Sequence, residues 1–265
     1  KITVVEALDH MLPMLDGDLT KIGVAHMKKM GMAFNLECPV QAVEASPVGA
    51  KVTCRNKAGE TVSFEAEKVL VAIGRKANTA SLNLEAAGLA NDRGRIIVND
   101  KMETSVPGVY AIGDVIGPRR IMLAHMAVAE AHTAVHNILH PEDRKAQRYD
   151  VVPSAIFTAP EIGDVGLSEA QAKQQGFAVK TSVFQFRELG KAQAMGELAG
   201  LFKLVVEEGS GKLLGAHIAG AHASDLIAEA TLAIQRGCTA RDLFETIHAH
   251  PTLSEGIYEA AGSLV

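Results

Sequence analysis

A strand, a helix and a second strand follow one another at the start of the chain, and this order limits the fold more than any other feature. Residues 2–6 form a short apolar run that predicts a buried strand. Asp16 or Asp18 can cap the helix that follows, and Gly31 is placed to end it. Further strands are expected at residues 32–36, 40–46, 51–55 and 61–65. Strands that are joined through a helix usually pair in parallel, so the start of the chain indicates an α/β unit.

Residues 68–74 are a continuous apolar run, Lys-Val-Leu-Val-Ala-Ile-Gly, which predicts a strand covered on both faces. The middle of the chain holds a second strand and turn at 109–114, a helix over about 122–139, and a charged linker at 141–148. The last part predicts a separate α+β unit. Its expected strands are 154–157, 179–186, 201–207 and 213–217, and its expected helices are 168–175, 224–237 and 239–248. We therefore divide the chain into residues 1–77, 78–147 and 148–265.

The charge and cysteine content exclude several classes of protein. The 265 residues carry 26 Lys and Arg against 31 Asp and Glu, a net charge of −5, whereas a non-specific grip on nucleic acid needs clustered positive charge. No apolar run approaches the roughly 20 residues that a membrane-spanning helix needs. The three cysteines are far apart and none belongs to a Cys-x-x-Cys pair. We expect a protein of a reducing, cytoplasmic compartment.

Glu6 ends the first predicted strand. An acid at this place in a dinucleotide-binding unit can accept hydrogen bonds from both hydroxyls of an adenosine ribose. Its charge would repel a 2′-phosphate, and residues 7–10 offer no arginine to receive one, which favours NAD over NADP. Taken alone, a glutamate such as Glu6 is more often an ordinary acid at a strand end. The Gly-x-Gly-x-x-Gly loop that would hold the pyrophosphate is not in this sequence, so we expect a piece of a longer protein.

A second candidate site combines residues 108–114, Gly-Val-Tyr-Ala-Ile-Gly-Asp, with residues 122–125, Met-Leu-Ala-His. Gly113 lets the backbone approach a ligand, and Asp114 presents a carboxylate to a sugar-like hydroxyl. The helix start that follows offers backbone N–H groups. The second element at this spacing favours a ligand site over a simple turn.

The third candidate site is the most specific and lies at residues 248–255, His-Ala-His-Pro-Thr-Leu-Ser-Glu. A loop histidine five residues before a glutamate that begins a helix can form a hydrogen-bonded dyad of His250 and Glu255. The carboxylate would fix the imidazole tautomer and raise its basicity, as a general base requires. One alternative is a metal pair of His248 and His250, although no further ligands stand at a recognisable spacing. The other alternative is a structural histidine with its hydrogen bonds satisfied, which would be favoured for almost any isolated histidine.

These three motifs, in this order, resemble the C-terminal part of FAD-dependent pyridine nucleotide–disulphide oxidoreductases, and the resemblance extends over the whole chain. Residues 157–162 and 165–169 support it as well. It implies that His250 is the active-site base with Glu255 as its partner. It further implies that Asp114, Met122, Leu123, Ala124 and His125 bind FAD, and that Glu6, Val40 and Gly74 line the NAD site. Ala77 departs from the family, which usually has proline there.

The resemblance implies a partial, Rossmann-like NAD domain (1–77), a central domain that completes the FAD site (78–147) and an α+β dimerisation domain (148–265). Within the family, the residues favour oxidation of protein-bound dihydrolipoamide by NAD⁺, in a homodimer that serves the lipoyl domains of 2-oxo acid dehydrogenase complexes or of the glycine cleavage system. The redox Cys-x₄-Cys pair of the family is not in this sequence, so we expect the chain alone to be inactive. A glutathione reductase-like enzyme, or an isolated dimerisation and binding module, remains the alternative.

Overall fold

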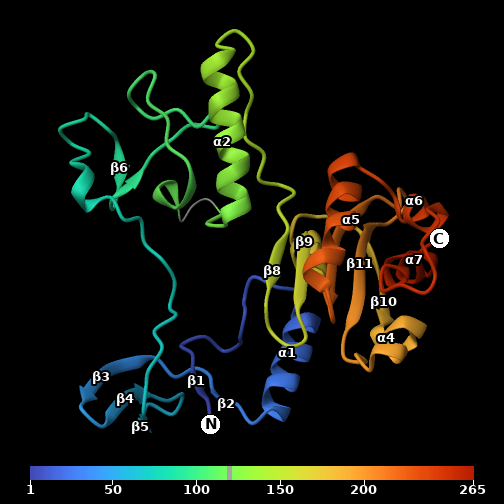
Figure 1. Cartoon of the computed structure of the whole chain (residues 1–265), viewed down its shortest axis with the longest axis horizontal. Helices are drawn as coiled ribbons and strands as arrows, with labels where there is room; N and C mark the ends of the chain where they lie inside the picture. The colour runs from blue at the N-terminus through green and yellow to red at the C-terminus, as the bar shows by residue number, and fades with distance from the viewer. Residues whose placement is uncertain (118–120) are drawn as a thin grey trace. The chain divides into compact units, whose positions relative to one another are not determined.

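The structure is a computed structural model that describes residues 1–117 and 121–265 (Figure 1). Contacts divide the chain into two compact units. The first unit joins residues 1–69 to residues 151–265, and the second unit comprises residues 70–150. Within the described ranges, no helix is both long and apolar enough to cross a bilayer.

The chain begins with the expected strand, helix and strand. β1 (Thr3–Val5) pairs in parallel with β2 (Ala33–Asn35), and α1 (Gly17–Lys29) connects them. The side chain of Asp16 caps α1 by accepting a hydrogen bond from the N–H of Asp18. The strand–helix–strand order and the cap were predicted from the sequence, and both predictions are confirmed.

A small antiparallel sheet follows, in the order β3 (Val40–Ser46), β4 (Gly49–Arg55) and β5 (Thr61–Ala66). One face of this sheet buries a compact cluster of Cys38, Val52 and Cys54. The strands correspond to three of the predicted ranges, because turn residues at 46–49 and 56–59 separate them.

The prediction of a buried strand at residues 68–74 is wrong. No strand is assigned there, and Leu70, Val71 and Ile73 are 89%, 66% and 94% exposed. A parallel strand is stabilised by hydrogen bonds to neighbouring strands, and β1 and β2 pair only with each other in the described chain. The apolar character of the run is not sufficient to make it a strand.

The largest sheet has five antiparallel strands in the order β10 (Val179–Gln185), β11 (Leu201–Glu207), β12 (Leu213–Ala219), β9 (Ile162–Gly166) and β8 (Ser154–Ile156). Every residue of β12 is buried, and so is β11 as far as Val206. Strand β9 had not been predicted, because Gly163, Asp164 and Gly166 interrupt its apolar pattern.

Five helices belong to the same part of the chain: α3 (Glu169–Gln174), α4 (Gly190–Met195), α5 (Ala223–Arg236), α6 (Ala240–Glu245) and α7 (Glu255–Gly262). α5 contacts β9 and β12, and α7 contacts β10 and β11. Ser168 and Gln171 form the predicted capping box of α3. The helix predicted over 239–248 is shorter, because the backbone leaves the helical region at Thr246.

Buried charges connect α1 to the five-stranded sheet. The Nζ of Lys203 on β11 lies 3.0 Å from Asp16 Oδ2 and 2.8 Å from Asp18 Oδ2, and the lysine side chain is 4% exposed. Burial opposes the charged form of Lys203, but its hydrogen bonds to Asp18 and Asp16 prevail and raise its pKa. Residues 1–69 and 151–265 therefore share an ionic contact as well as the apolar one between Leu19 and Ile162.

Among its described residues, 70–117 and 121–150, the second unit holds few regular elements. They are the 3₁₀ turns η1 (Ala80–Leu82) and η2 (Gly113–Ile116), the short strands β6 (Asn91–Asp92) and β7 (Arg95–Ile96), and the helix α2 (Ala124–Leu139). The predicted helix is confirmed. The strand predicted at 109–114 is wrong: the segment makes one isolated bridge, from Tyr110 to Glu103, before it turns into η2.

Candidate active site

His250 and Glu255 lie in and after the loop that connects α6 to α7. The loop leaves α6 after Glu245 and reaches the start of α7 at Glu255. The bond between His250 and Pro251 is cis. His250 Nδ1 lies 2.8 Å from Glu255 Oε1, and the imidazole is 77% exposed while the carboxylate side chain is 21% exposed. The two residues that the sequence singled out therefore form a hydrogen-bonded pair at the surface of this chain.

The charge of Glu255 sets the role of each nitrogen of His250. The backbone N–H of Thr252 donates to Glu255 Oε2 at 2.8 Å, and this bond, together with the bond from His250, lowers the pKa of Glu255 below its ordinary value. An ionised carboxylate can only accept, so Nδ1 of His250 carries the hydrogen. In the neutral ring, Nε2 then has a free lone pair, and no described residue occupies it. The pair has the geometry of a general base.

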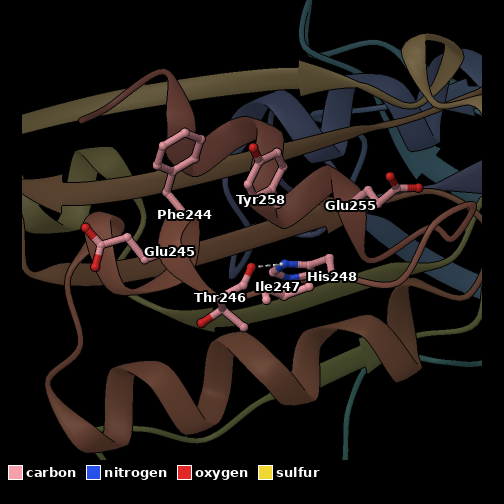
Figure 2. A pocket seen from close by; sticks show the side chains of 7 residues that line it. All are labelled: Phe244, Glu245, Thr246, Ile247, His248, Glu255 and Tyr258. Atoms are coloured by element: carbon pink, nitrogen blue, oxygen red, sulfur yellow. Dashed lines mark hydrogen bonds between the residues drawn. The ribbon is translucent and has the colours of Figure 1, made fainter.

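A hollow of about 350 Å³ opens beside the dyad (Figure 2). It is lined by residues 244–248 and by Glu255 and Tyr258 of α7. The rings of Phe244 and Tyr258 stack with their centroids 5.0 Å apart. One wall of the hollow is therefore aromatic, and Glu255 of the dyad is also one of its lining residues.

A second histidine–carboxylate pair lies two residues before His250. His248 Nε2 is 2.9 Å from Glu229 Oε1, and its ring is 6% exposed. Since His248 and His250 are bonded to different carboxylates, they are not arranged as a pair of ligands for one metal ion. Among residues 1–117 and 121–265, no group of three histidine, cysteine or acidic side chains is arranged to hold a metal ion.

The residues predicted to bind the flavin lie at the start of α2 and in η2. Gly113 has φ +73°, and its N–H donates to Glu130 Oε2 at 2.7 Å. The carboxyl group of Glu130 is fully buried and also accepts from the hydroxyl of Tyr149 at 2.7 Å. Asp114 is 43% exposed, and its pairing with Arg75 at 3.3 Å is a weak surface contact. A buried carboxyl group thus fixes the turn and leaves Asp114 accessible.

Met122, Leu123, Ala124 and His125 form the entry to α2. A Cβ at Gly117 would lie 2.7 Å from the sulfur of Met122, so the end of η2 and this entry are in contact. Leu123 is the N-cap and makes no side-chain capping bond, while Ala124 and His125 are exposed. An accessible carboxylate beside an uncapped helix start suits the hydroxyls and polar edge of a flavin, so these residues fit the group.

The residues predicted for the NAD site are divided between the two units of the chain. Glu6 accepts a hydrogen bond from the N–H of Leu8 at 2.9 Å at the end of β1, and Val40 begins β3 with 48% of its surface exposed. Gly74 has φ +116° and belongs to the second unit. Their assignment to NAD stays a prediction.

Sequence reasoning missed three residues that hold these sites: Glu130, Tyr149 and Glu229. Glu130 lies on α2, five residues after His125, and an acid at a buried position of a helix was the available signal. Tyr149 and Glu229 carried no signal, because their contacts depend on tertiary folding.

Comparison with known proteins places the chain in a family. Residues 1–131 match the family model described as pyridine nucleotide-disulphide oxidoreductase, and residues 152–261 match the dimerisation domain of the same proteins. The chain belongs to the pyridine nucleotide-disulphide oxidoreductases, whose members use FAD and NAD(H).

Its relatives include proteins named dihydrolipoyl dehydrogenase. One from Halobacterium salinarum is 43% identical over 98% of this chain and 54% of its own length, and one from Chlamydia pneumoniae is 40% identical over 98% and 55%. The chain thus spans about half the length of the curated relatives it matches. LpdA from Mycobacterium tuberculosis superposes with a TM-score of 0.88 at 29% identity, over 99% of this chain and 56% of that one.

Proposed function

We propose that this chain is part of a dihydrolipoyl dehydrogenase that oxidises protein-bound dihydrolipoamide to lipoamide and reduces NAD⁺. The observation that carries the proposal is the exposed imidazole of His250. Its Nδ1 is hydrogen-bonded to an ionised Glu255, and no described residue is bonded to its Nε2. The relatives of the same name support it over nearly the full chain.

The role of His250 follows from thiol chemistry. The thiolate is the nucleophile in thiol–disulphide exchange, and a free thiol is a poor one. Nε2 of His250 would take the proton of a substrate thiol while Glu255 stabilises the imidazolium that forms. The net reaction converts a dithiol and NAD⁺ into a cyclic disulphide, NADH and a proton. The Cys-x₄-Cys pair on which this exchange depends is not among these 265 residues, and Cys38, Cys54 and Cys238 do not have its spacing.

FAD, when bound, carries the two electrons from the dithiol to NAD⁺. Asp114 would bind its ribityl hydroxyls, and the entry to α2 at Met122–His125 would line the ring end. Glu130 would fix the turn at Gly113, since its carboxyl group accepts a hydrogen bond from the Gly113 N–H.

Glu6 supports NAD as the nucleotide in place of NADP. A carboxylate at the end of β1 suits ribose hydroxyls and repels a 2′-phosphate. Replacement of Glu6 by alanine in the full-length protein should raise the KM for NAD⁺ and reduce the discrimination against NADP⁺. An unchanged ratio of kcat/KM for the two nucleotides would contradict this assignment.

The proposed protein is a homodimer, as the dimerisation domain at residues 152–261 supports. The base of one subunit would act on the disulphide of the other, so that a monomer has no complete site. Its partners would be the lipoyl domains of 2-oxo acid dehydrogenase complexes or of the glycine cleavage system. Three cysteines without a disulphide support a reducing, cytoplasmic location.

The test is His250→Gln in the full-length protein, assayed with dihydrolipoamide and NAD⁺. Loss of the base should lower kcat by about 10²-fold or more. His222→Gln is the matched control, because His222 is a surface histidine at the start of α5 and should leave kcat unchanged. Unchanged turnover in His250→Gln would remove the base role. Rapid turnover of glutathione disulphide with NADPH would instead favour the glutathione reductase-like alternative.

A further inference from the structure

His248 is held more firmly than His250, although only one residue separates them. Its Nε2 lies 2.9 Å from Glu229 Oε1, and its Nδ1 lies 2.9 Å from the carbonyl oxygen of Thr246. Its ring packs against the ring of Tyr258, with 5.9 Å between the two centroids. Figure 2 shows the bond to Thr246 at the edge of the hollow. His248 therefore connects the loop to both α5 and α7.

Both hydrogen-bond partners of His248 are acceptors. A carboxylate oxygen and a backbone carbonyl cannot donate, so both bonds form together only when each ring nitrogen carries a hydrogen. In that form the ring is a cation paired with the carboxylate of Glu229. Glu229 lies on α5, which is anchored on the five-stranded sheet by the buried residues Ile227 and Ala230. The loop is thus bonded to a rigid element two residues before His250.

His248 also acts electrostatically on the dyad. The pKa of Glu255 is lowered first by the Thr252 N–H, then by His250, and to a smaller extent by the charge of His248. The charged or titratable groups around His248 are Glu229 on α5, Glu255 and Tyr258 on α7, and Glu245 at the end of α6. Removal of the His248 charge leaves Glu255 with one cation fewer.

We propose that His248, bonded to Glu229, is a positioning residue that fixes the loop 246–250 so that His250 meets Glu255 and turns Nε2 outward. This inference rests on the function proposed above, in which His250 is the base. His248 touches neither substrate nor cofactor in this role. Its effect passes through the orientation of His250 and the ionisation of Glu255.

Three variants of the full-length protein test the proposal. His248→Phe keeps a ring against Tyr258 and removes both donors. His248→Gln keeps a donor at the distance of Nε2, and Glu229→Gln keeps the shape of the acceptor and removes its charge. His222→Gln and His250→Gln are assayed beside them. Each protein is measured for kcat, for the KM of NAD⁺, for the pH profile of kcat, and for NADH oxidation by ferricyanide, which bypasses the dithiol step.

We expect His248→Phe to lower kcat with dihydrolipoamide by about 10-fold, as a misplaced base does, with the KM of NAD⁺ and the ferricyanide rate unchanged. The pKa of Glu255 should rise in this variant, because the carboxylate loses a neighbouring cation, and the pH profile of kcat should therefore differ from that of the wild type. His248→Gln should retain most of the wild-type kcat. Glu229→Gln should have a kcat about 3-fold below that of the wild type.

Each of the following results would overturn the proposal. A wild-type kcat and pH profile in His248→Phe, together with an impaired His250→Gln, would leave the base intact and refute the positioning role. An equal loss of the ferricyanide rate would indicate a purely structural role. Unimpaired His250→Gln would refute the proposed function and this inference with it. If His248→Phe does not form a folded dimer, the test depends on Glu229→Gln alone. A wild-type kcat and pH profile in Glu229→Gln would then refute the positioning role of His248.

Discussion

Two apolar runs of this chain differ in burial: one is buried and the other is exposed to solvent. β12, Leu213–Ala219, is buried along its whole length, whereas residues 68–74 form no strand and expose Leu70 and Ile73 almost completely. β12 has hydrogen-bonded strands on both sides and α5 against it. It even buries His217, whose Nδ1 is 2.6 Å from Asp164 on β9. The comparison teaches that neighbouring strands, more than apolar composition, decide whether such a run is buried.

The largest effect on the free energy of unfolding is expected when a lysine in each of the two surroundings is replaced by methionine. Lys203→Met in the 265-residue chain leaves Asp16, which is 4% exposed, without its buried partner, and should lower the free energy of unfolding by about 3–5 kcal/mol. Lys68→Met, in the exposed run, should change it by less than about 0.5 kcal/mol. Urea unfolding at pH 7 measures both, and equal effects would contradict the comparison.

The same ionic cluster predicts a pH dependence. The pKa of Asp18 is lowered, chiefly by the hydrogen bond from Lys203, and that of Glu169 is lowered by Lys173 and Lys203. Carboxyl groups with lowered pKa contribute stability above their unfolded pKa of about 4, and that stability is lost as the pH falls. The urea midpoint of the wild type should therefore decrease from pH 6 to pH 3. A slope that is equally steep in Lys203→Met would exclude Lys203 as its source.

A leucine pair tests burial without charge. Leu204 on β11 is 1% exposed and Leu70 is 89% exposed. Leu204→Ala should lower the free energy of unfolding by about 2–5 kcal/mol, because it removes buried methyl groups and leaves a cavity. Leu70→Ala should have an effect within about 0.5 kcal/mol. If Leu70→Ala were as costly as Leu204→Ala, the run at 68–74 would have to be packed in solution.

A glycine pair sharpens the comparison within the C-terminal residues. A Cβ at Gly256 in α7 would clash with the Phe202 ring, whereas a Cβ at Gly190 in α4 meets nothing within 4 Å. Gly256→Ala should cost about 1–3 kcal/mol through overpacking. Gly190→Ala should stabilise by up to about 1 kcal/mol, through the helix propensity of alanine. Thermal or urea unfolding of the two variants would separate them, and similar midpoints would argue against tight packing at Phe202.

The smallest expected effect is a difference in thiol reactivity between the buried cysteines of the small sheet and Cys238. Burial, and then the neighbouring Cys38 thiol, raise the pKa of Cys54, so little thiolate forms there at neutral pH. Cys238 is partly exposed. Iodoacetamide at pH 7.5 should label Cys238 first, and Cys38 and Cys54 only after denaturant is added. Mass spectrometry of the digested protein would detect the order, and early labelling of Cys54 would contradict the burial of the small sheet.

The elements that were predicted correctly depend on local chemistry. The Asp16 cap, the Ser168–Gln171 capping box and the period of α2 are all contained within a few residues of sequence. The hydrogen bond between His250 and Glu255 was likewise expected from a five-residue spacing, and it is present. Their catalytic role, and the cofactor assignments, stay predictions.

The elements that were not predicted depend on distant partners. The run at 68–74 lacks the neighbouring strands that its composition suggested. β9 has glycines where an apolar alternation was sought, and only its pairing with β12 makes it a strand. Glu229 lies 19 residues from His248 and meets it only because α5 and the loop converge on one side of the sheet.

The division of the chain has a further consequence for how it would respond to a protease. The first unit is discontinuous, and its two stretches are tied together by Lys203 with Asp16 and by Leu19 with Ile162. A single cut between residues 140 and 150 would sever the backbone without breaking any of these ties. We expect the two products to stay together as a non-covalent complex, which would separate only in denaturant.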